Sequence, residues 1–142
     1  MCAQVDPINS VQFSNHTGYN GGWRGEVLQG EQLWALIEGL QTNGLLHGYT
    51  HLLTGYIGSA SFLRTVLRAL RELRAVNPSM SYHCDPVMGD LGKLYVPDEL
   101  VAIYREEVVP LARCALDPAP PARAPTISHP RSLPQRDYAQ PL

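Results

Sequence analysis

The sequence of 142 residues predicts an α/β fold, in which helices flank a short parallel sheet. Segments with the residue pattern of strands alternate along the chain with segments whose apolar residues have helical spacing. The connections between successive strands are long enough to contain a helix, which a parallel pairing requires. In such a sheet, a ligand is expected at the carboxyl ends of the strands.

The N-terminal half contains two predicted strands and one predicted helix. The first strand covers residues 8–13, where side chains alternate, and leads into the polar, glycine-rich loop SNHTGYNGG. The helix covers residues 31–43, with leucine and isoleucine at helical spacing and Asn43-Gly44 as its end. The second strand covers residues 49–56, which are partly β-branched and aromatic, and runs into the loop TGYIG.

A long helix, a third strand and a shorter helix are predicted next. Ser61 is the expected cap of the long helix, which ends at Asn77-Pro78. Its expected buried face consists of Phe62, Leu63, Val66, Leu67, Leu70 and Leu73. The third strand covers residues 80–86 and continues into the loop that contains DPVMGD, and a helix follows at residues 98–109. The loops SNHTGYNGG, TGYIG and DPVMGD are therefore expected to converge on one edge of the sheet.

The last 30 residues differ from the rest of the chain. Residues 113–142 are rich in proline and have no apolar periodicity. Proline fixes φ and removes a backbone donor, so neither a helix nor a sheet is expected to run through this segment. We predict one folded domain over residues 1–112 and a disordered tail over residues 113–142.

Charge and composition exclude several classes of function. A net charge of -2 gives no field that would attract nucleic acid or an anionic membrane. The three cysteines are odd in number and far apart, which favours neither a disulfide framework nor a zinc site. The chain has no signal-peptide pattern and no run of about 20 apolar residues. These features predict a cytosolic protein with a small-molecule ligand and no nucleic-acid or membrane partner.

The candidate chemistry lies in the three loops. Asp85 and Asp90 follow a predicted strand and could hold Mg²⁺, which at the end of a strand usually binds phosphate groups. Equally, Asp85 could begin a turn while Asp90 faces solvent. Thr17 offers a hydroxyl to a polar ligand or, alternatively, to its own turn. Tyr19 and Tyr56 could stack on a flat heterocycle or simply pack. The glycines form neither a Walker A loop nor a GxGxxG motif.

Four strings of residues, taken in order, resemble the pyridoxal kinase family of the ribokinase-like superfamily. They are NSVQFSNHTGY, LTGY, CDPVMGDLGKLYVP and YREEVVPLA, and the resemblance covers about residues 5–112. It implies ATP-dependent transfer of a phosphoryl group to the 5′-hydroxymethyl group of pyridoxal, pyridoxine or pyridoxamine, a step of vitamin B6 salvage. It also implies Mg²⁺, and K⁺ or Na⁺, as cofactors, and a homodimer.

The resemblance assigns roles to five residues. Thr17 and Tyr56 match the family residues that contact the pyridine ring. Asp85 and Asp90 match carboxylates near the metal ions and the ATP phosphates, and Tyr95 matches a tyrosine on the mobile flap over the site. These residues would form the vitamer and metal side of a kinase pocket.

The same resemblance implies that parts of the family pattern are missing. Family members begin with a further strand and helix, and continue beyond the equivalent of Ala112 with a TPN-type strand, an adenine platform and a GTGD anion hole. The aspartate of GTGD is the general base, and the motif does not occur in this sequence. We therefore assign no catalytic residue and expect a truncated kinase that is inactive alone. Two alternatives stay open: an active phosphotransferase that uses other groups, and a noncatalytic module that pairs with a full-length subunit.

Overall fold

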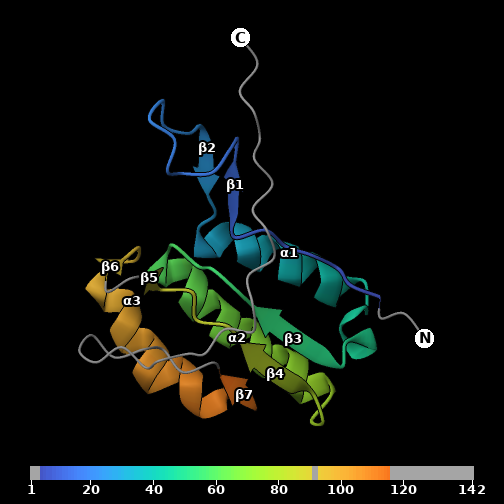
Figure 1. Ribbon diagram of the computed structural model, residues 1–142. Coiled ribbons are helices and arrows are strands. Elements are labelled where there is room, and N and C mark those ends of the chain that lie inside the picture. The colour runs from blue at the N-terminus through green and yellow to red at the C-terminus, as the bar shows by residue number, and fades with distance from the viewer. Residues whose placement is uncertain (1–3, 91–92, 116–142) are drawn as a thin grey trace.

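The computed structural model describes residues 4–90 and 93–115, which form helices and short strands (Figure 1). The strands are β1 (Val11–Phe13), β2 (Gly25–Val27), β3 (His51–Thr54), β4 (Ser81–Cys84), β5 (Gly89–Asp90), β6 (Lys93–Leu94) and β7 (Cys114–Ala115). The helices are α1 (Gly30–Thr42), the 3₁₀ turn η1 (Leu46–Gly48), α2 (Ala60–Val76), α3 (Asp98–Ile103), the π-helical turn η2 (Tyr104–Val108) and the 3₁₀ turn η3 (Val109–Leu111).

The centre of the fold is a parallel sheet with the strand order β3-β4-β7. Helix α2 connects β3 to β4, and the continuous helical segment from α3 to η3 connects β4 to β7. Parallel neighbours need such crossovers, because the chain must return to the same end of the sheet. The predicted α/β class, with a short parallel sheet flanked by helices, is confirmed.

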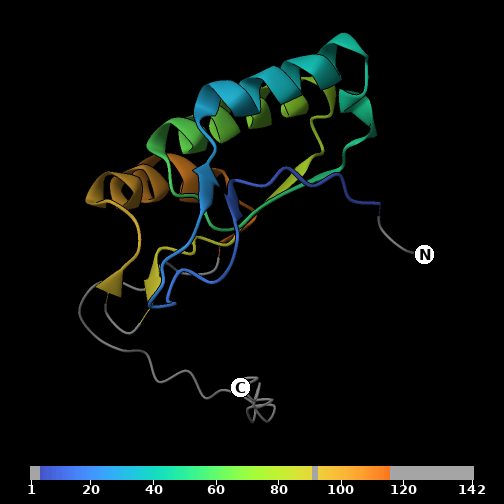
Figure 2. The same cartoon turned by 90° about the horizontal axis from the view of Figure 1, so that it is seen from above.

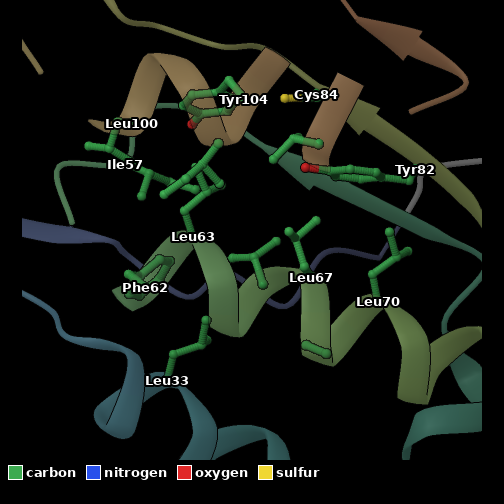
Figure 3. Close-up of a cluster of buried hydrophobic side chains, with 14 of the residues drawn as sticks. Leu33, Ile57, Phe62, Leu63, Leu67, Leu70, Tyr82, Cys84, Leu100 and Tyr104 are labelled. Atoms are coloured by element: carbon green, nitrogen blue, oxygen red, sulfur yellow. The ribbon is translucent and has the colours of Figure 1, made fainter. Parts of the chain in front are cut away.

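Helix α2 lies between α1 and the sheet, and its apolar face forms the core (Figure 3). All six residues predicted for that face are buried: Phe62, Leu63, Val66, Leu67, Leu70 and Leu73. On the sheet side they meet Tyr82 of β4 together with Leu100 and Tyr104 of the following helical segment. Figure 2 shows α1 and α2 running side by side.

The start of α2 differs from the prediction. The cap is Ser59, whose side-chain oxygen accepts a hydrogen bond from the Phe62 amide at 3.3 Å. Ser61, the predicted cap, instead accepts a hydrogen bond from the Gly30 amide of α1 at 3.1 Å. A Cβ atom at Gly30 would lie 2.5 Å from the Ser61 carbonyl oxygen. Ser61 therefore stabilises the close packing of α1 against α2, a contact between distant residues that a local capping rule does not detect.

The first strand also differs from the prediction. Instead of joining the parallel sheet, β1 pairs in an antiparallel hairpin with β2, a strand that the sequence pattern did not predict. Gly25 has φ +141 in this hairpin, and a Cβ there would overlap the Gln12 carbonyl oxygen, so only glycine fits. The loop SNHTGYNGG therefore forms the tip of a hairpin that projects from the body of the fold (Figure 1).

The sheet continues past the predicted domain boundary at residue 112, because Cys114–Ala115 forms β7. Residues 116–142, which hold most of the predicted disordered tail, lie outside the described residues, and the boundary itself stays a prediction. Within the described ranges, no helix has the length and apolar character that a membrane span requires.

Candidate functional site

Two of the three predicted loops leave the sheet at the same edge. Strands β3 and β4 end in register, with Thr54 opposite Cys84. The Asp85 amide then donates a hydrogen bond to the Thr54 carbonyl oxygen at 2.8 Å. The segments TGYIG and DPVMGD therefore begin side by side at the carboxyl ends of neighbouring strands, where a parallel sheet places its ligands.

Asp85 has a fixed backbone and an exposed side chain. Besides the bond of its amide to Thr54, its carbonyl oxygen accepts a hydrogen bond from the Val87 amide at 2.9 Å. The resulting tight turn confirms that Asp85 begins a turn. The turn also leaves the carboxylate at the sheet edge, where a cation can reach it, so the two alternatives for this residue are compatible.

Asp90 lies in β5, where its backbone pairs with Lys93 of β6. The preceding residue, Gly89, allows the two strands to approach closely, because a Cβ there would overlap the Lys93 carbonyl oxygen. The Tyr95 amide donates to the Met88 carbonyl oxygen at 2.8 Å and closes the β5–β6 hairpin. The predicted closeness of the two aspartate carboxylates stays a prediction, as does the role of Tyr95 in a flap.

Tyr56 follows β3 after Gly55 and is half-buried against the core. Its ring folds back over the following loop, because a Cβ at Gly58 would lie 3.1 Å from the Tyr56 hydroxyl oxygen. Its carbonyl oxygen accepts a hydrogen bond from the Ser10 hydroxyl at 2.5 Å. This contact ties the base of the β1–β2 hairpin to the edge that carries Tyr56 and Asp85.

Thr17 is exposed in the loop at the tip of this hairpin. The side chain of Asn15 orders the loop by donating to the carbonyl oxygens of His16 and Gly22, at 2.9 and 3.0 Å. The tip of the hairpin lies apart from the sheet and from β5–β6 (Figure 1). The structure therefore brings Tyr56 and Asp85 to one edge and leaves the loop of Thr17 at a distance from it.

The sequence interpretation missed Tyr104, which lies beneath this edge. Its side chain is fully buried, and its hydroxyl has no hydrogen-bond partner among the described residues. Burial, followed by the nearby charges of Cys84 and Asp85, raises the pKa of the Tyr104 hydroxyl above its ordinary value. Leu100, Tyr104 and Val108 are all buried at four-residue intervals, and this spacing could have identified the tyrosine as a core residue.

The residues that could hold a cation are few. Among residues 4–90 and 93–115, no group of three or more His, Cys, Asp or Glu side chains could hold a metal ion. Mg²⁺ does not need such a cage, because it usually binds one or two carboxylates together with substrate phosphates and water. The exposed Asp85 carboxylate fits this mode of binding and does not fit a protein-only metal centre.

Solved structures identify the class of fold. Pyridoxal kinase from Leishmania donovani in complex with ADP and pyridoxamine matches with a TM-score of 0.71 and 37% identity, over 76% of this chain and 38% of that chain. Pyridoxal kinase from Trypanosoma brucei matches with a TM-score of 0.65 and 33% identity, over 76% of this chain and 36% of that chain. The described part of the chain is thus a partial ribokinase-like α/β fold.

Curated relatives identify the family. Pyridoxal kinase from Arabidopsis thaliana is 68% identical over 108 residues, which cover 76% of this chain and 34% of that protein. Pyridoxal kinase from Sus scrofa is 51% identical over 113 residues, 77% of this chain and 34% of that protein. No family model matches the chain. Over about three quarters of its length, the chain belongs to the pyridoxal kinase family, and it spans about a third of the length of these relatives.

Proposed function

We propose that this chain carries the vitamer and metal side of a pyridoxal kinase site. The reaction would be the ATP-dependent phosphorylation of pyridoxal, pyridoxine or pyridoxamine to the 5′-phosphate. The observation that carries the proposal is the shared edge at which Tyr56 and Asp85 follow neighbouring strands. Support for the ligands comes from the Leishmania donovani kinase, whose solved structures contain ADP with pyridoxamine or pyridoxine.

The proposed roles follow from the chemistry of each side chain. The ring of Tyr56 would pack on the pyridine ring, and Thr17 would hydrogen-bond to its substituents. Asp85 and Asp90 would hold Mg²⁺, which neutralises phosphate charge, and Tyr95 would cover the bound ligands. K⁺ or Na⁺ as a further cofactor, a homodimer and a cytosolic location are part of the same proposal.

We also propose that the chain does not phosphorylate pyridoxal alone. The sequence contains no GTGD motif and so lacks the family's anion hole and general base. A positioned base typically contributes about 10²–10⁴-fold to a rate. The donors of an oxyanion-type site contribute about 10²–10³-fold. Carboxylates bound to a metal are poor acceptors for the proton of the alcohol, so the aspartates do not replace the base.

The activity test uses purified chain with ATP, Mg²⁺, K⁺ and pyridoxal, and follows pyridoxal 5′-phosphate by its absorbance. We expect no turnover above the level of an enzyme-free control. Turnover that disappears in the Asp90→Ala variant would contradict this expectation, because a contaminating kinase would be unaffected by that substitution.

A binding test examines the site separately from turnover. Pyridoxal is titrated with and without Mg²⁺, and tyrosine and tryptophan fluorescence is recorded. We expect weak binding that Tyr56→Ala removes, and a Mg²⁺ effect that Asp85→Asn removes. Asp98→Asn, which changes an exposed carboxylate at the start of α3, is the control and should bind as the parent does. ATP affinity equal to that of an intact kinase and unaffected by Asp90→Ala would show that the site is misplaced.

The structure also favours a second candidate function, a noncatalytic module that pairs with a full-length kinase subunit. Leu53, in the parallel sheet, is 74% exposed, which is unusual for a strand of this kind. Co-purification of the chain with a full-length pyridoxal kinase tests this alternative. A chain that stays monomeric in the presence of the kinase would exclude it.

A further inference from the structure

The chain contains two Asn-Gly pairs, and both are exposed to solvent. Asn20-Gly21 lies in the loop at the tip of the β1–β2 hairpin, and Asn43-Gly44 follows the end of α1. Asparagine is a chemically labile residue, and a following glycine has no side chain that would obstruct the loss of its side-chain amide. The structure around each pair therefore decides how readily it reacts in the folded chain.

The reaction joins the backbone of the glycine to the side chain of the asparagine. The glycine amide nitrogen gives its proton to hydroxide and attacks the side-chain carbonyl carbon, Cγ, of the asparagine. A bond forms between this nitrogen and Cγ, the bond from Cγ to Nδ2 breaks, and Nδ2 leaves as ammonia after taking a proton from water. Water then opens the resulting succinimide ring at either carbonyl and gives aspartate or isoaspartate. Nothing is oxidised or reduced, and water is the only co-reactant.

Hydrogen bonds hold the Asn43-Gly44 pair in place. The Asn43 side-chain nitrogen donates to the Gly39 carbonyl oxygen at 2.8 Å. The Gly44 amide, which would be the attacking group, donates to the Gln41 carbonyl oxygen at 3.0 Å. Both bonds must break before the Gly44 nitrogen can attack Cγ of Asn43. The reaction at this pair therefore requires a local opening of the helix end.

The Asn20-Gly21 pair has no such restraint. Among the described residues, neither the Asn20 side chain nor the Gly21 amide forms a hydrogen bond. A Cβ atom at Gly21 would meet no atom within 4 Å, so no neighbouring group crowds this position. The tip of the hairpin also projects from the body of the fold, where water can reach it (Figure 1). Both groups that react are therefore available without any opening of the structure.

We propose that Asn20 is a site of spontaneous deamidation in the folded chain, while Asn43 is protected from the same reaction. The product carries an additional negative charge at the tip of the hairpin, three residues from Thr17. Where the product is isoaspartate, the backbone of residue 20 also lengthens by a methylene group. This change falls inside the turn in which the Gly22 amide donates to the Tyr19 carbonyl oxygen at 2.9 Å. The proposal rests on the loop alone and does not depend on the proposed kinase function.

The experiment incubates the folded chain in a mildly alkaline buffer and follows each asparagine by peptide mapping with mass spectrometry. Deamidation is detected by the mass difference between asparagine and aspartate, and isoaspartate by its separate chromatographic retention. We expect Asn20 to react about tenfold faster than Asn43 or more, because the hydrogen bonds at Asn43 must open first. The same incubation in guanidinium chloride gives the rate of each pair without the fold. There, the Asn43 rate should rise and approach that of Asn20.

Three variants connect the reaction to its chemistry. Gly21→Ala adds a Cβ beside the attacking nitrogen and should slow the reaction at Asn20 severalfold, without a clash in the fold. Asn20→Gln should abolish the reaction at this position, because ring closure would need a larger ring. Gly48→Ala also places a Cβ in open space and is the matched control, expected to leave both rates unchanged. Circular dichroism of the parent and the variants checks that each is folded.

Four outcomes would overturn the proposal. Equal rates at Asn20 and Asn43 in the folded chain would show that the local structure does not select between the pairs. Absence of reaction at Asn20, over a time in which it reacts in guanidinium chloride, would show that the loop protects it. An Asn43 rate that guanidinium chloride does not change would mean that its hydrogen bonds give no protection. An unchanged Asn20 rate in Gly21→Ala would contradict attack by the Gly21 nitrogen.

Discussion

Replacing Tyr104 by phenylalanine is expected to stabilise the chain. The tyrosine side chain is 0% exposed, and its hydroxyl has no hydrogen-bond partner in the part of the chain that the structure describes. A buried polar group without a partner destabilises a fold by about 1–3 kcal/mol. Tyr104→Phe keeps the ring in contact with Leu63 and Leu100 and removes this group (Figure 3). We therefore expect the free energy of unfolding to rise by about 1–2 kcal/mol.

Tyr82→Phe is the matched control, because it deletes the same atom from a second fully buried tyrosine. The Tyr82 hydroxyl lies 3.1 Å from the Thr54 hydroxyl, with which it forms a buried hydrogen bond. Its removal breaks that bond and leaves the Thr54 side chain, which is 8% exposed, without this partner. We expect Tyr82→Phe to lower the free energy of unfolding by about 1–2 kcal/mol.

The assay is urea unfolding of the parent and both variants, followed by circular dichroism and tryptophan fluorescence. The two variants should differ from each other by about 2–4 kcal/mol, with the parent between them. Equal slopes with denaturant would show that the unfolded states are comparable. Destabilisation by Tyr104→Phe as large as that by Tyr82→Phe would refute the reasoning, since it would mean that the Tyr104 hydroxyl makes a favourable contact in solution.

Three further predictions concern backbone packing and pH. Gly30→Ala should destabilise the contact between α1 and α2 by about 1–3 kcal/mol, because the new Cβ meets the backbone of Ser61. Gly39→Ala has open space around it and should stabilise α1 by about 0.5–1 kcal/mol. Urea unfolding measures both changes. Gly25→Ala should disrupt the β1–β2 hairpin and quench or shift the fluorescence of its tryptophan, while Gly21→Ala, also in open space, should not. Burial raises the pKa of both buried tyrosines in the folded state above the ordinary value near 10. The folded state therefore loses stability as the pH rises above about 10, because the tyrosines of the unfolded chain ionise there and the buried ones do not. The urea concentration at the unfolding midpoint should be lower at pH 11 than at pH 9, and this decrease should be smaller in Tyr104→Phe.

The sequence predicted the elements whose signals are local. The six apolar residues of α2 recur at helical spacing, and the structure buries all of them on one face. The strands at residues 51–54 and 81–84 lie within the predicted segments, and their parallel pairing follows from the helix that joins them. Because strand ends determine where the following loops begin, the common edge of Tyr56 and Asp85 could also be predicted.

The elements that depend on contacts between distant residues could not be predicted. The three residues of β2 are too short for an alternating pattern, and the hairpin depends on the approach of Gly25 to the Gln12 backbone. Ser59 and Ser61 are equally good caps by composition, and contact with α1 decides between them. The unpartnered hydroxyl of Tyr104 likewise depends on three packed elements, so a spacing rule identifies its burial and not its environment.

The core and the edge of the sheet separate the question of stability from that of activity. The core includes Leu63, Leu67 and Tyr82, and the hydrogen bonds of β3 and β4 hold the edge at which Asp85 begins. This edge is therefore formed by contacts within the described residues. If the chain lacks activity because the anion hole and base are missing, stabilising the core by Tyr104→Phe should leave turnover at zero. Restoration of activity by core stabilisation alone would show instead that the edge, rather than the chemistry, is deficient.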